Sequence, residues 1–409
     1  EFIRRAEYTV RPVYCSKDNY IHRKIVLNSL VAEKLFALET DENNPLQESP
    51  YFMEYLRGRK EQSMRQWLFY NDFYRKAKID PARVTERTAL AGRTYDISYF
   101  SLQDESAARS LAAAVSDSAD LKQRFTRLSG AEEMPRRKVR WNNLESRAVL
   151  NALYSGNPKK GDIIGPLRDG GSYTFVLVNG WTRRVRLSDN TGAQIQTDVA
   201  DQLRRHSAEA VYAEFVSSLM RGKSMQFYEE SFRALVPLLA DRYLKTPDEK
   251  EEAFNRRFWE DKEMPADTQE QRAVLEEIMD DPLLKTGDEV WTVRDFEKEL
   301  VSHPLVFRKK NISAAEFAEQ LKLAAADLIR DKHITEEAYS RGYDTVNVVE
   351  RNYAMWKDNL SALYHRNRWL ESRGKKDAFE SSVLKVLAND LNPYIRELQR
   401  KYGDDIFID

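Results

Sequence analysis

The sequence predicts an α+β protein that is mainly helical, with one small domain of strands and helices inserted between helical modules. Three observations lead to this class. Apolar residues recur at helical spacing through most of the chain. The stretch from Thr94 to Gly180 instead alternates β-rich runs with short helical segments. Charged residues make up 32% of the 409 residues, as expected for a soluble chain with solvated helices.

The N-terminal part is predicted to be helical. Ile21–Glu39 has leucines and valine at helical spacing, which indicates an amphipathic helix. Ser49-Pro50 and Asp80-Pro81 each place a capping residue before a proline, the usual start of a helix. We expect the helix after Ser49 to reach about Lys78 and the next helix to end near Gly92.

The inserted domain is predicted from a change in composition. In order, we expect a strand, a helix broken near Asp117–Asp120, a short strand and a helix: Thr94–Leu102, Asp104–Ser129, Lys138–Trp141 and Leu144–Tyr154. Two strands follow around Asp169-Gly170-Gly171, whose glycines suit a tight turn. The first is Ile163-Ile164, which Gly165-Pro166 is expected to end, and the second is Tyr173–Val178. With the broken helix counted once, the order is β-α-β-α-β-β.

Helices are predicted to dominate again after Thr197. Asp198–Met220 and Met225–Leu244 are expected to form two helices joined at Gly222, and Pro282–Val293 a hairpin with its turn at Gly287-Asp288. Thr246 with Glu249, Thr268 with Gln271 and Ser313 with Glu316 have the spacing of capping boxes. The remaining helices are expected over Thr292–Leu300, Ser313–Arg330, Thr335–Tyr343, Val346–Ser372 and Asp377–Tyr402.

Two segments of the chain resemble each other. Pro12–Tyr20 aligns with Pro304–Ile312, Glu1-Phe2 aligns with Asp295-Phe296 after a gap, and an amphipathic helix follows each segment. Few positions are identical, so chance similarity is the alternative to a duplicated helical module. The domains predicted from these patterns are a helical module at 1–92, the inserted domain at 93–182, a helical segment at 183–284 that packs with the first module, and a C-terminal helical module at 285–409 that repeats it.

Bulk properties exclude several kinds of chemistry. The net charge of −1 gives no reason to expect a nucleic-acid or anionic-membrane partner. The single cysteine, Cys15, excludes internal disulfides and cysteine-based metal sites. No apolar run approaches the ~18 residues of a membrane span. No pair of histidines has metal-ligand spacing, and no phosphate loop or nucleophile motif occurs, so neither metal nor cofactor is expected. The start at Glu1 fits either a removed signal peptide or a trimmed chain.

The predicted strand pair resembles the closing strands of parvulin-type prolyl isomerases. In that family the strands read roughly Gly-Glu-(Ile/Val)-x-x-Pro-(Ile/Val), a turn, and Gly-Tyr-His-Ile-Ile-Lys-Val. The positions of this chain that fit the pattern are Gly161, Ile163, Pro166, Leu167, Tyr173, Phe175, Val176 and Val178. Gly287–Thr292, followed by Asp295-Phe296 and a long amphipathic helix, resembles the chaperone module of SurA-like periplasmic proteins. In these proteins the isomerase domain also lies between helical segments.

The resemblance implies a site for polypeptide. Parvulins have one histidine on the first strand and one on the last, and here Tyr99 and Thr174 occupy these positions. We therefore expect little or no isomerase activity, and a substrate-binding surface formed by Tyr99, Trp141, Leu144, Val149, Leu153 and Thr174. The alternative is that Tyr99 and Thr174 only fill neighbouring strands and that Trp141 is a core residue.

Three functions are consistent with these patterns. The first, which we favour, is a periplasmic chaperone that binds unfolded or extended client proteins through helical modules and a degenerate parvulin-like domain. The second is an active prolyl isomerase in which hydroxyl groups replace the histidines. The third is a helical scaffold for one fixed partner. The resemblance implies export to the periplasm. From net charge and apolar runs we expect no nucleic-acid partner and no integral membrane segment in this chain, and a dimer is possible.

Overall fold

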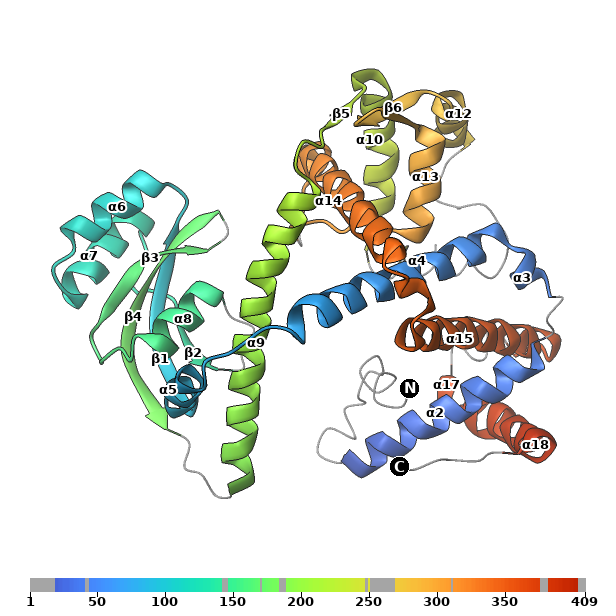
Figure 1. Cartoon of the computed structure of the whole chain (residues 1–409), viewed down its shortest axis with the longest axis horizontal. Coiled ribbons are helices and arrows are strands. Elements are labelled where there is room, and N and C mark those ends of the chain that lie inside the picture. The colour runs from blue at the N-terminus through green and yellow to red at the C-terminus, as the bar shows by residue number, and fades with distance from the viewer. Residues whose placement is uncertain are drawn as a thin grey trace. The chain divides into compact units, whose positions relative to one another are not determined.

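The computed structural model divides into two compact units. Unit 1 combines Glu1–Tyr70 with Glu214–Asp409, and unit 2 is the continuous segment Asn71–Ala213. Each unit contains helices and one small antiparallel sheet, which confirms the α+β class (Figure 1). The structure describes residues 19–40, 44–141, 146–169, 171–183, 189–246, 249–250, 269–309, 312–375 and 382–403.

Unit 2 is built on a four-stranded antiparallel sheet with the order β2-β1-β4-β3. The long strands β1 (Arg93–Leu102) and β4 (Ser172–Arg183) form its centre, with β2 (Arg136–Arg140) and β3 (Ile163–Asp169) at the edges. All four strands were predicted, because each contains a short β-rich run between turn residues. The limits of β1 and β2 agree within two residues, whereas β3 and β4 continue further than predicted, to Asp169 and Arg183.

Helices cover both faces of this sheet, because side chains alternate between the faces along each strand. Tyr95, Ile97, Val176 and Val178 pack against one group of helices, and Phe100, Phe175 and Leu177 face the other way. The first face is covered by α5 (Pro81–Ala91), α8 (Arg147–Ser155) and the first part of α9 (Asp189–Leu219). The second is covered by α6 (Glu105–Ala114) and α7 (Ser118–Ser129).

Strand β3 differs from its prediction. Gly165-Pro166 was expected to end the strand, but β3 continues to Asp169 with a shift of register between Ile164 and Leu167. A proline lacks the N–H that the ladder would need, and an edge strand with a bulge tolerates that loss. Gly165 has a φ of 144°, and a Cβ there would lie 2.8 Å from the Thr174 carbonyl oxygen, so the bulge needs glycine.

Unit 1 is mostly helical. Its described elements are α2 (Asn19–Glu39), α3 (Pro45–Glu48), α4 (Pro50–Leu68) with the π-helical turn η2 (Phe69–Tyr74) leading out of it, the end of α9, β5 (Met225–Phe227), α10 (Glu229–Tyr243), α12 (Gln269–Ile278), β6 (Pro282–Thr286), β7 (Glu289–Thr292), α13 (Val293–Ser302), α14 (Ala314–Ser340), η3 (Tyr343–Thr345), α15 (Asn347–Ser372), α17 (Val383–Val386), η4 (Leu387–Leu391) and α18 (Asn392–Tyr402).

Two predictions in unit 1 are wrong. Met225–Phe227 is not the start of a helix but strand β5, which pairs with β6 of the predicted hairpin to give the sheet β5-β6-β7. The helices expected over Ser313–Arg330 and Thr335–Tyr343 are one helix, α14. No glycine or proline lies between them, and the buried Ile334 packs the junction into the protein.

The core of unit 1 joins segments that are far apart in the sequence. Helix α4 packs against α13, α14 and α15, so a helix from the first part of the chain completes the C-terminal part (Figure 1). The largest apolar cluster joins α10, the hairpin, α13 and α14, and Leu235, Phe296 and Phe317 lie at its centre. A second cluster joins α2, α15 and α18 through Leu35, Leu370 and Leu398.

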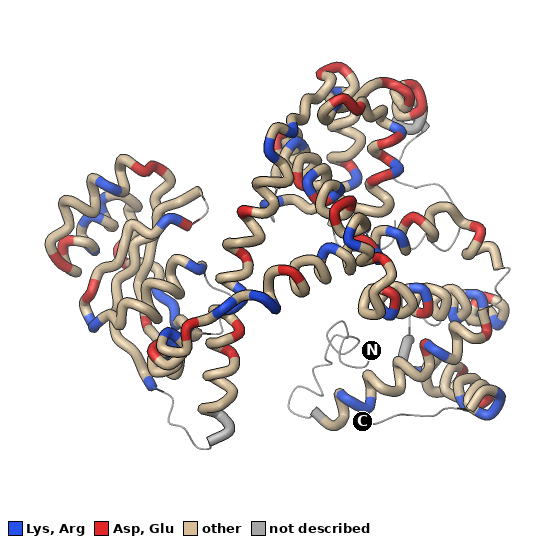
Figure 2. The backbone as a smooth tube through the Cα atoms, viewed as in Figure 1, with Lys and Arg blue, Asp and Glu red and all other residues tan. Residues whose placement is uncertain are grey.

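Some sequence predictions lie outside the described residues. They include most of Pro12–Tyr20, which is the first copy of the proposed repeat, together with Cys15 and Leu144. The domain division remains a prediction, and its limits at 92/93 and 182/183 both fall inside unit 2. Basic and acidic residues alternate along both units (Figure 2). Among the described helices, none combines the length and apolar character that crossing a bilayer requires.

Candidate functional site

The structure places Tyr99 and Thr174 on the same face of the unit 2 sheet. Tyr99 on β1 lies opposite Val176, and Thr174 on β4 lies opposite Ser101, so the two residues are diagonal neighbours. Thr174 is 4% exposed, and its Oγ1 is 2.8 Å from the Ser101 Oγ. The Arg137 guanidinium lies 3.9 Å from the centre of the Tyr99 ring. Both side chains therefore already have partners within the fold.

Trp141, Val149 and Leu153 belong to the apolar cluster on this face. Val149 and Leu153 are fully buried, and the Trp141 ring meets the Tyr154 ring edge to face at 5.2 Å. They hold α8 against the sheet in this conformation, and their contact with a substrate remains a prediction. The five histidines of the chain are His22, His206, His303, His333 and His365, so none belongs to this sheet.

A second candidate site lies in unit 1, in a groove of about 510 Å³. Part of its lining is Leu305, Val306 and Phe307, which follow α13 without regular secondary structure. Ala324 and Leu328 of α14 add further apolar surface. Val306 is 77% exposed. Leu305, Ala324 and Leu328 are buried in the core of unit 1 and Phe307 packs against it, so Val306 is the exposed member of this apolar lining.

Several charged residues that line the groove are paired with one another, whereas Arg59 contacts the uncharged Tyr55 and Gln62. The Arg308 guanidinium contacts both carboxylate oxygens of Asp327, at 2.9 and 2.8 Å. Arg330 contacts Asp327 and Asp331, each at 2.7 Å. An apolar ligand in the groove would therefore leave these ion pairs in place and would not bury an uncompensated charge.

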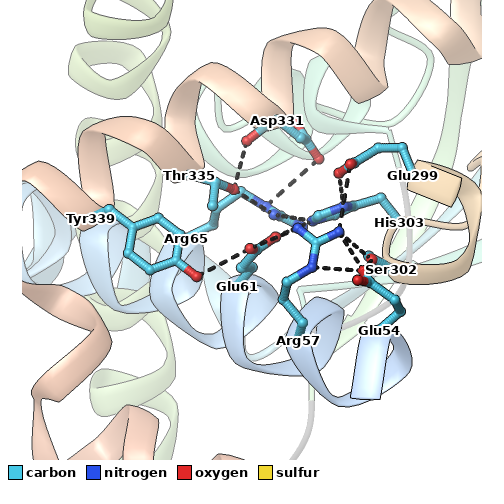
Figure 3. Close-up of polar contacts among 10 residues, drawn as sticks. All are labelled: Glu54, Arg57, Glu61, Arg65, Glu299, Ser302, His303, Asp331, Thr335 and Tyr339. Carbon is cyan, nitrogen blue, oxygen red and sulfur yellow. Dashed lines mark hydrogen bonds and ion pairs between the residues drawn. The ribbon is translucent and has the colours of Figure 1, made fainter. Parts of the chain in front are cut away.

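A polar cluster lies beside the groove where three helices meet (Figure 3). Its members project at helical spacing from α4, from α13 with the residue that follows it, and from α14. They are Glu54, Arg57, Glu61, Arg65, Glu299, Ser302, His303, Asp331, Thr335 and Tyr339. The helices approach closely here, since a Cβ on Gly58 would lie only 1.8 Å from the Ser302 carbonyl oxygen. Glycine at this position allows α4 to pack against α13.

His303 is at the centre of the cluster, and its side chain is 10% exposed. Its Nε2 is 3.0 Å from a Glu61 oxygen, and its Nδ1 is 2.7 Å from a Glu299 oxygen. Arg57 contacts Glu61 at 3.1 Å and donates a hydrogen bond of 2.6 Å to the Ser302 hydroxyl. The network thus ties α4 to the end of α13 through charge-assisted hydrogen bonds.

The network shifts the pKa values of its members. Burial acts to lower the pKa of His303, but hydrogen bonds to Glu299 and then Glu61 outweigh burial and raise it above 6.5. Burial acts to raise the pKa values of Glu61 and Glu299, but for each the hydrogen bond to His303 and the charge of Arg57 lower it. The buried ion pairs therefore favour a protonated imidazole between two carboxylates.

Glu61, Glu299 and His303 are also the kind of residues that bind metals, with ligand atoms within 4.8 Å of one another. Their arrangement suits an ion network better. The two carboxylates contact opposite nitrogens of the imidazole ring, so one ion cannot replace both contacts without rearrangement. Arg57 also lies beside both carboxylates, at 3.1 Å from Glu61 and 3.6 Å from Glu299. We therefore assign the cluster a structural role in shaping the groove.

This cluster was not identified from the sequence. A signal was present in the spacing of Glu54, Arg57, Glu61 and Arg65, which places four charged groups on one side of α4. The spacing of Glu299 and His303 gives a matching pair at the end of α13. The sequence does not show that the two stripes meet, because they are more than two hundred residues apart.

Comparison with family models and with curated proteins finds no match for this chain. Among solved structures, it is similar to a chain from a study of the virulence factor PEB4 and the periplasmic protein Cj1289, described as two structurally related SurA-like chaperones of Campylobacter jejuni. The identity is 12%, the match covers 55% of this chain and 95% of that chain, and the TM-score is 0.20. A TM-score of this size does not establish a shared arrangement of elements.

Proposed function

We propose that this protein is a chaperone that binds unfolded polypeptide in the groove of unit 1 without isomerising prolyl bonds. The observation that carries the proposal is the groove itself. Its lining combines the exposed Val306 and the half-buried Phe307 with the buried Leu305 and Leu328, beside charged residues that already have partners. An extended apolar segment can bury its side chains there at ~25 cal/mol per Å² without a charge of its own.

The chemistry of unit 2 supports binding without catalysis. Rotation about a prolyl bond faces a barrier of ~18–20 kcal/mol, and an isomerase lowers it with polar groups placed around the turning amide. At the two positions where parvulins have histidines, Thr174 is hydrogen-bonded to Ser101 and the Tyr99 ring is covered by Arg137. Neither group supplies the chemistry of an imidazole. We therefore expect the protein not to accelerate prolyl isomerisation.

Export to the periplasm and clients among outer-membrane or secreted proteins are part of this proposal. They come from the resemblance of the strand pair Gly161–Val178 to parvulins and of Gly287–Thr292 to SurA-like modules. The order of the strands in unit 2, β2-β1-β4-β3, is compatible with that resemblance.

An aggregation assay tests the proposal. A chemically unfolded outer-membrane protein is diluted into buffer with increasing amounts of the full chain, and light scattering is followed. We expect suppression near equimolar ratio. Val306→Glu should raise the concentration needed about tenfold, because a charge in the groove removes a contact worth about 1.4 kcal/mol or more. Val290→Glu is the control, since Val290 is also exposed, at 43%, but does not line the groove.

Two outcomes contradict the proposal. If the full chain leaves aggregation unchanged, it is not a chaperone for this class of client, and co-purification of one stoichiometric partner would then indicate a scaffold. If it accelerates the isomerisation of a proline-containing peptide above the uncatalysed rate, the proposed absence of catalysis is wrong.

A further inference from the structure

Unit 2 contains a cavity of about 730 Å³ that has no part in the chaperone proposal. It lies between α5, α8 and α9, and Arg87 of α5 is part of its lining. Ile79, Leu150 and Leu203 give it apolar walls. All of its lining residues belong to unit 2, and all are among the described residues.

Arg87 is buried without an anionic partner. It is 6% exposed, and its polar contact is a long one of 3.4 Å from its Nη1 to the Asn151 Oδ1. Its guanidinium also lies 6.0 Å from the centre of the Trp141 ring. Within the described chain, no carboxylate pairs with it. Buried arginines are almost always paired, because a buried cation without an anion is costly. Arg87 therefore has the capacity to bind an anion that the fold does not supply.

The charged residues around Arg87 are mainly basic, which also favours an anionic ligand. The lining also includes Lys78, Arg83 and Arg205, with Arg147 beside them. Two acidic residues of the lining are not paired with Arg87: Glu209 pairs with Arg147, and the Asp80 carboxylate accepts a hydrogen bond from the Ala82 backbone N–H as the N-cap of α5. The burial of Arg87 and the nearby charge of Arg83 lower the pKa of Arg87, and they outweigh the charge of Glu86, which acts to raise it. An anion in the cavity would relieve both effects.

The apolar lining of the cavity indicates that the part of the ligand beyond its anionic group is apolar. Ile79, Leu150 and Leu203 are partly buried and pack at the edge of the core, so a ligand can cover them. Trp141 also lines the cavity, and its buried Nε1 has no hydrogen-bond acceptor in the described structure. A planar carboxylate matches a single guanidinium bidentately, and an apolar body would fill the walls.

We propose that this cavity binds a carboxylate that carries an apolar group, with the carboxylate on Arg87 and the apolar group against Ile79, Leu150 and Leu203. Two sources share this chemistry. One is the C-terminal carboxylate of a polypeptide that ends in an apolar residue, and the other is a small aromatic or aliphatic acid. The proposal stands independently of client binding in unit 1.

Isothermal titration calorimetry of the full chain tests the site with 3-phenylpropionate and with its uncharged amide. We expect saturable 1:1 binding of the acid and at least tenfold weaker binding of the amide, as expected when a charge-assisted hydrogen bond is lost. A hexapeptide ending in Leu-Phe, with a free or an amidated C-terminus, identifies the source. Preference for the free peptide assigns the site to chain ends. Binding of the small acid alone assigns it to small acids.

Arg87→Met separates a binding role from a structural one. It replaces the buried cation by an apolar side chain of similar length, so we expect an unchanged or higher Tm together with at least tenfold weaker binding of the acid. Arg109→Met on the exposed face of α6 is the matched control and should bind like the wild type. The proposal is overturned if Arg87→Met binds normally or lowers the Tm strongly, if neither the acid nor the free peptide binds, or if inorganic phosphate binds more tightly than the acid.

Discussion

His303 couples the stability of unit 1 to pH. Its folded-state pKa is raised above 6.5, so the stabilisation it provides is complete below pH 6.5 and is lost as the pH rises through the folded-state value. We expect the difference in Tm between the wild type and His303→Gln to be largest near pH 6 and to shrink toward pH 9. Thermal unfolding followed by circular dichroism measures this difference. A difference that grows with pH would contradict the proposed charge state.

A substitution at Gly58 tests whether α4 and α13 approach as closely as the structure shows. An alanine Cβ would lie 1.8 Å from the Ser302 carbonyl oxygen, so the helices must separate. We expect Gly58→Ala to lower the free energy of unfolding by about 3 kcal/mol, at the upper end of overpacking effects. Urea denaturation measures it. Gly92→Ala is the control, because a Cβ there meets no atom within 4 Å, and it should be neutral or slightly stabilising. Equal effects of the two substitutions would refute the packing described here.

At the scale of elements, the N-terminus of α13 depends on a capping box. The Thr292 Oγ1 accepts a hydrogen bond from the Asp295 backbone N–H, and the Asp295 carboxylate accepts one from the Thr292 backbone N–H. We expect Thr292→Ala to lower the free energy of unfolding by about 1 kcal/mol. Thr292→Ser keeps a hydroxyl group and should retain most of that stability. Denaturant unfolding of the three proteins gives the values, and a full loss with serine would show that the cap is not the cause.

The local signals in the sequence predicted most elements well. N-caps before proline marked α4 and α5, β-rich runs marked all four strands of unit 2, and Gly287-Asp288 marked the hairpin. The errors lie where tertiary contacts decide. Met225–Phe227 is a strand because β6 is there to pair with it, and α14 continues past Arg330 because Ile334 is buried. β3 passes Pro166 because an edge strand accepts a bulge.

The candidate site follows the same pattern. Tyr99 and Thr174 were identified from the resemblance of their strands to those of parvulins, and the strands themselves were predicted from local β-rich runs. The polar cluster and the groove of unit 1 were not predicted, because they require α4 to meet α13 and α14. No pattern in Glu61 or His303 alone specifies that contact.

At the scale of the whole molecule, unit 2 is a continuous segment with its own core, while unit 1 is formed by two separate segments. We expect a fragment of residues 71–213 to fold by itself. A fragment of residues 93–182, cut at the limits predicted from sequence, lacks α5 and α9 and should expose the face that Val84, Leu90 and Val199 cover. Nuclear magnetic resonance spectra should be dispersed for the longer fragment only. Well-dispersed spectra for both would show that α5 and α9 are dispensable.

Site-specific photo-crosslinking is the most direct test of the claim that the groove of unit 1 binds unfolded polypeptide. A photoreactive amino acid is placed at position 306, in the groove, or at position 290, exposed outside it, and the full chain is mixed with an unfolded outer-membrane protein. The account predicts a crosslinked product from position 306 that an excess of unlabelled client removes, and little product from position 290. Equal crosslinking at both positions, or none at 306, would contradict it.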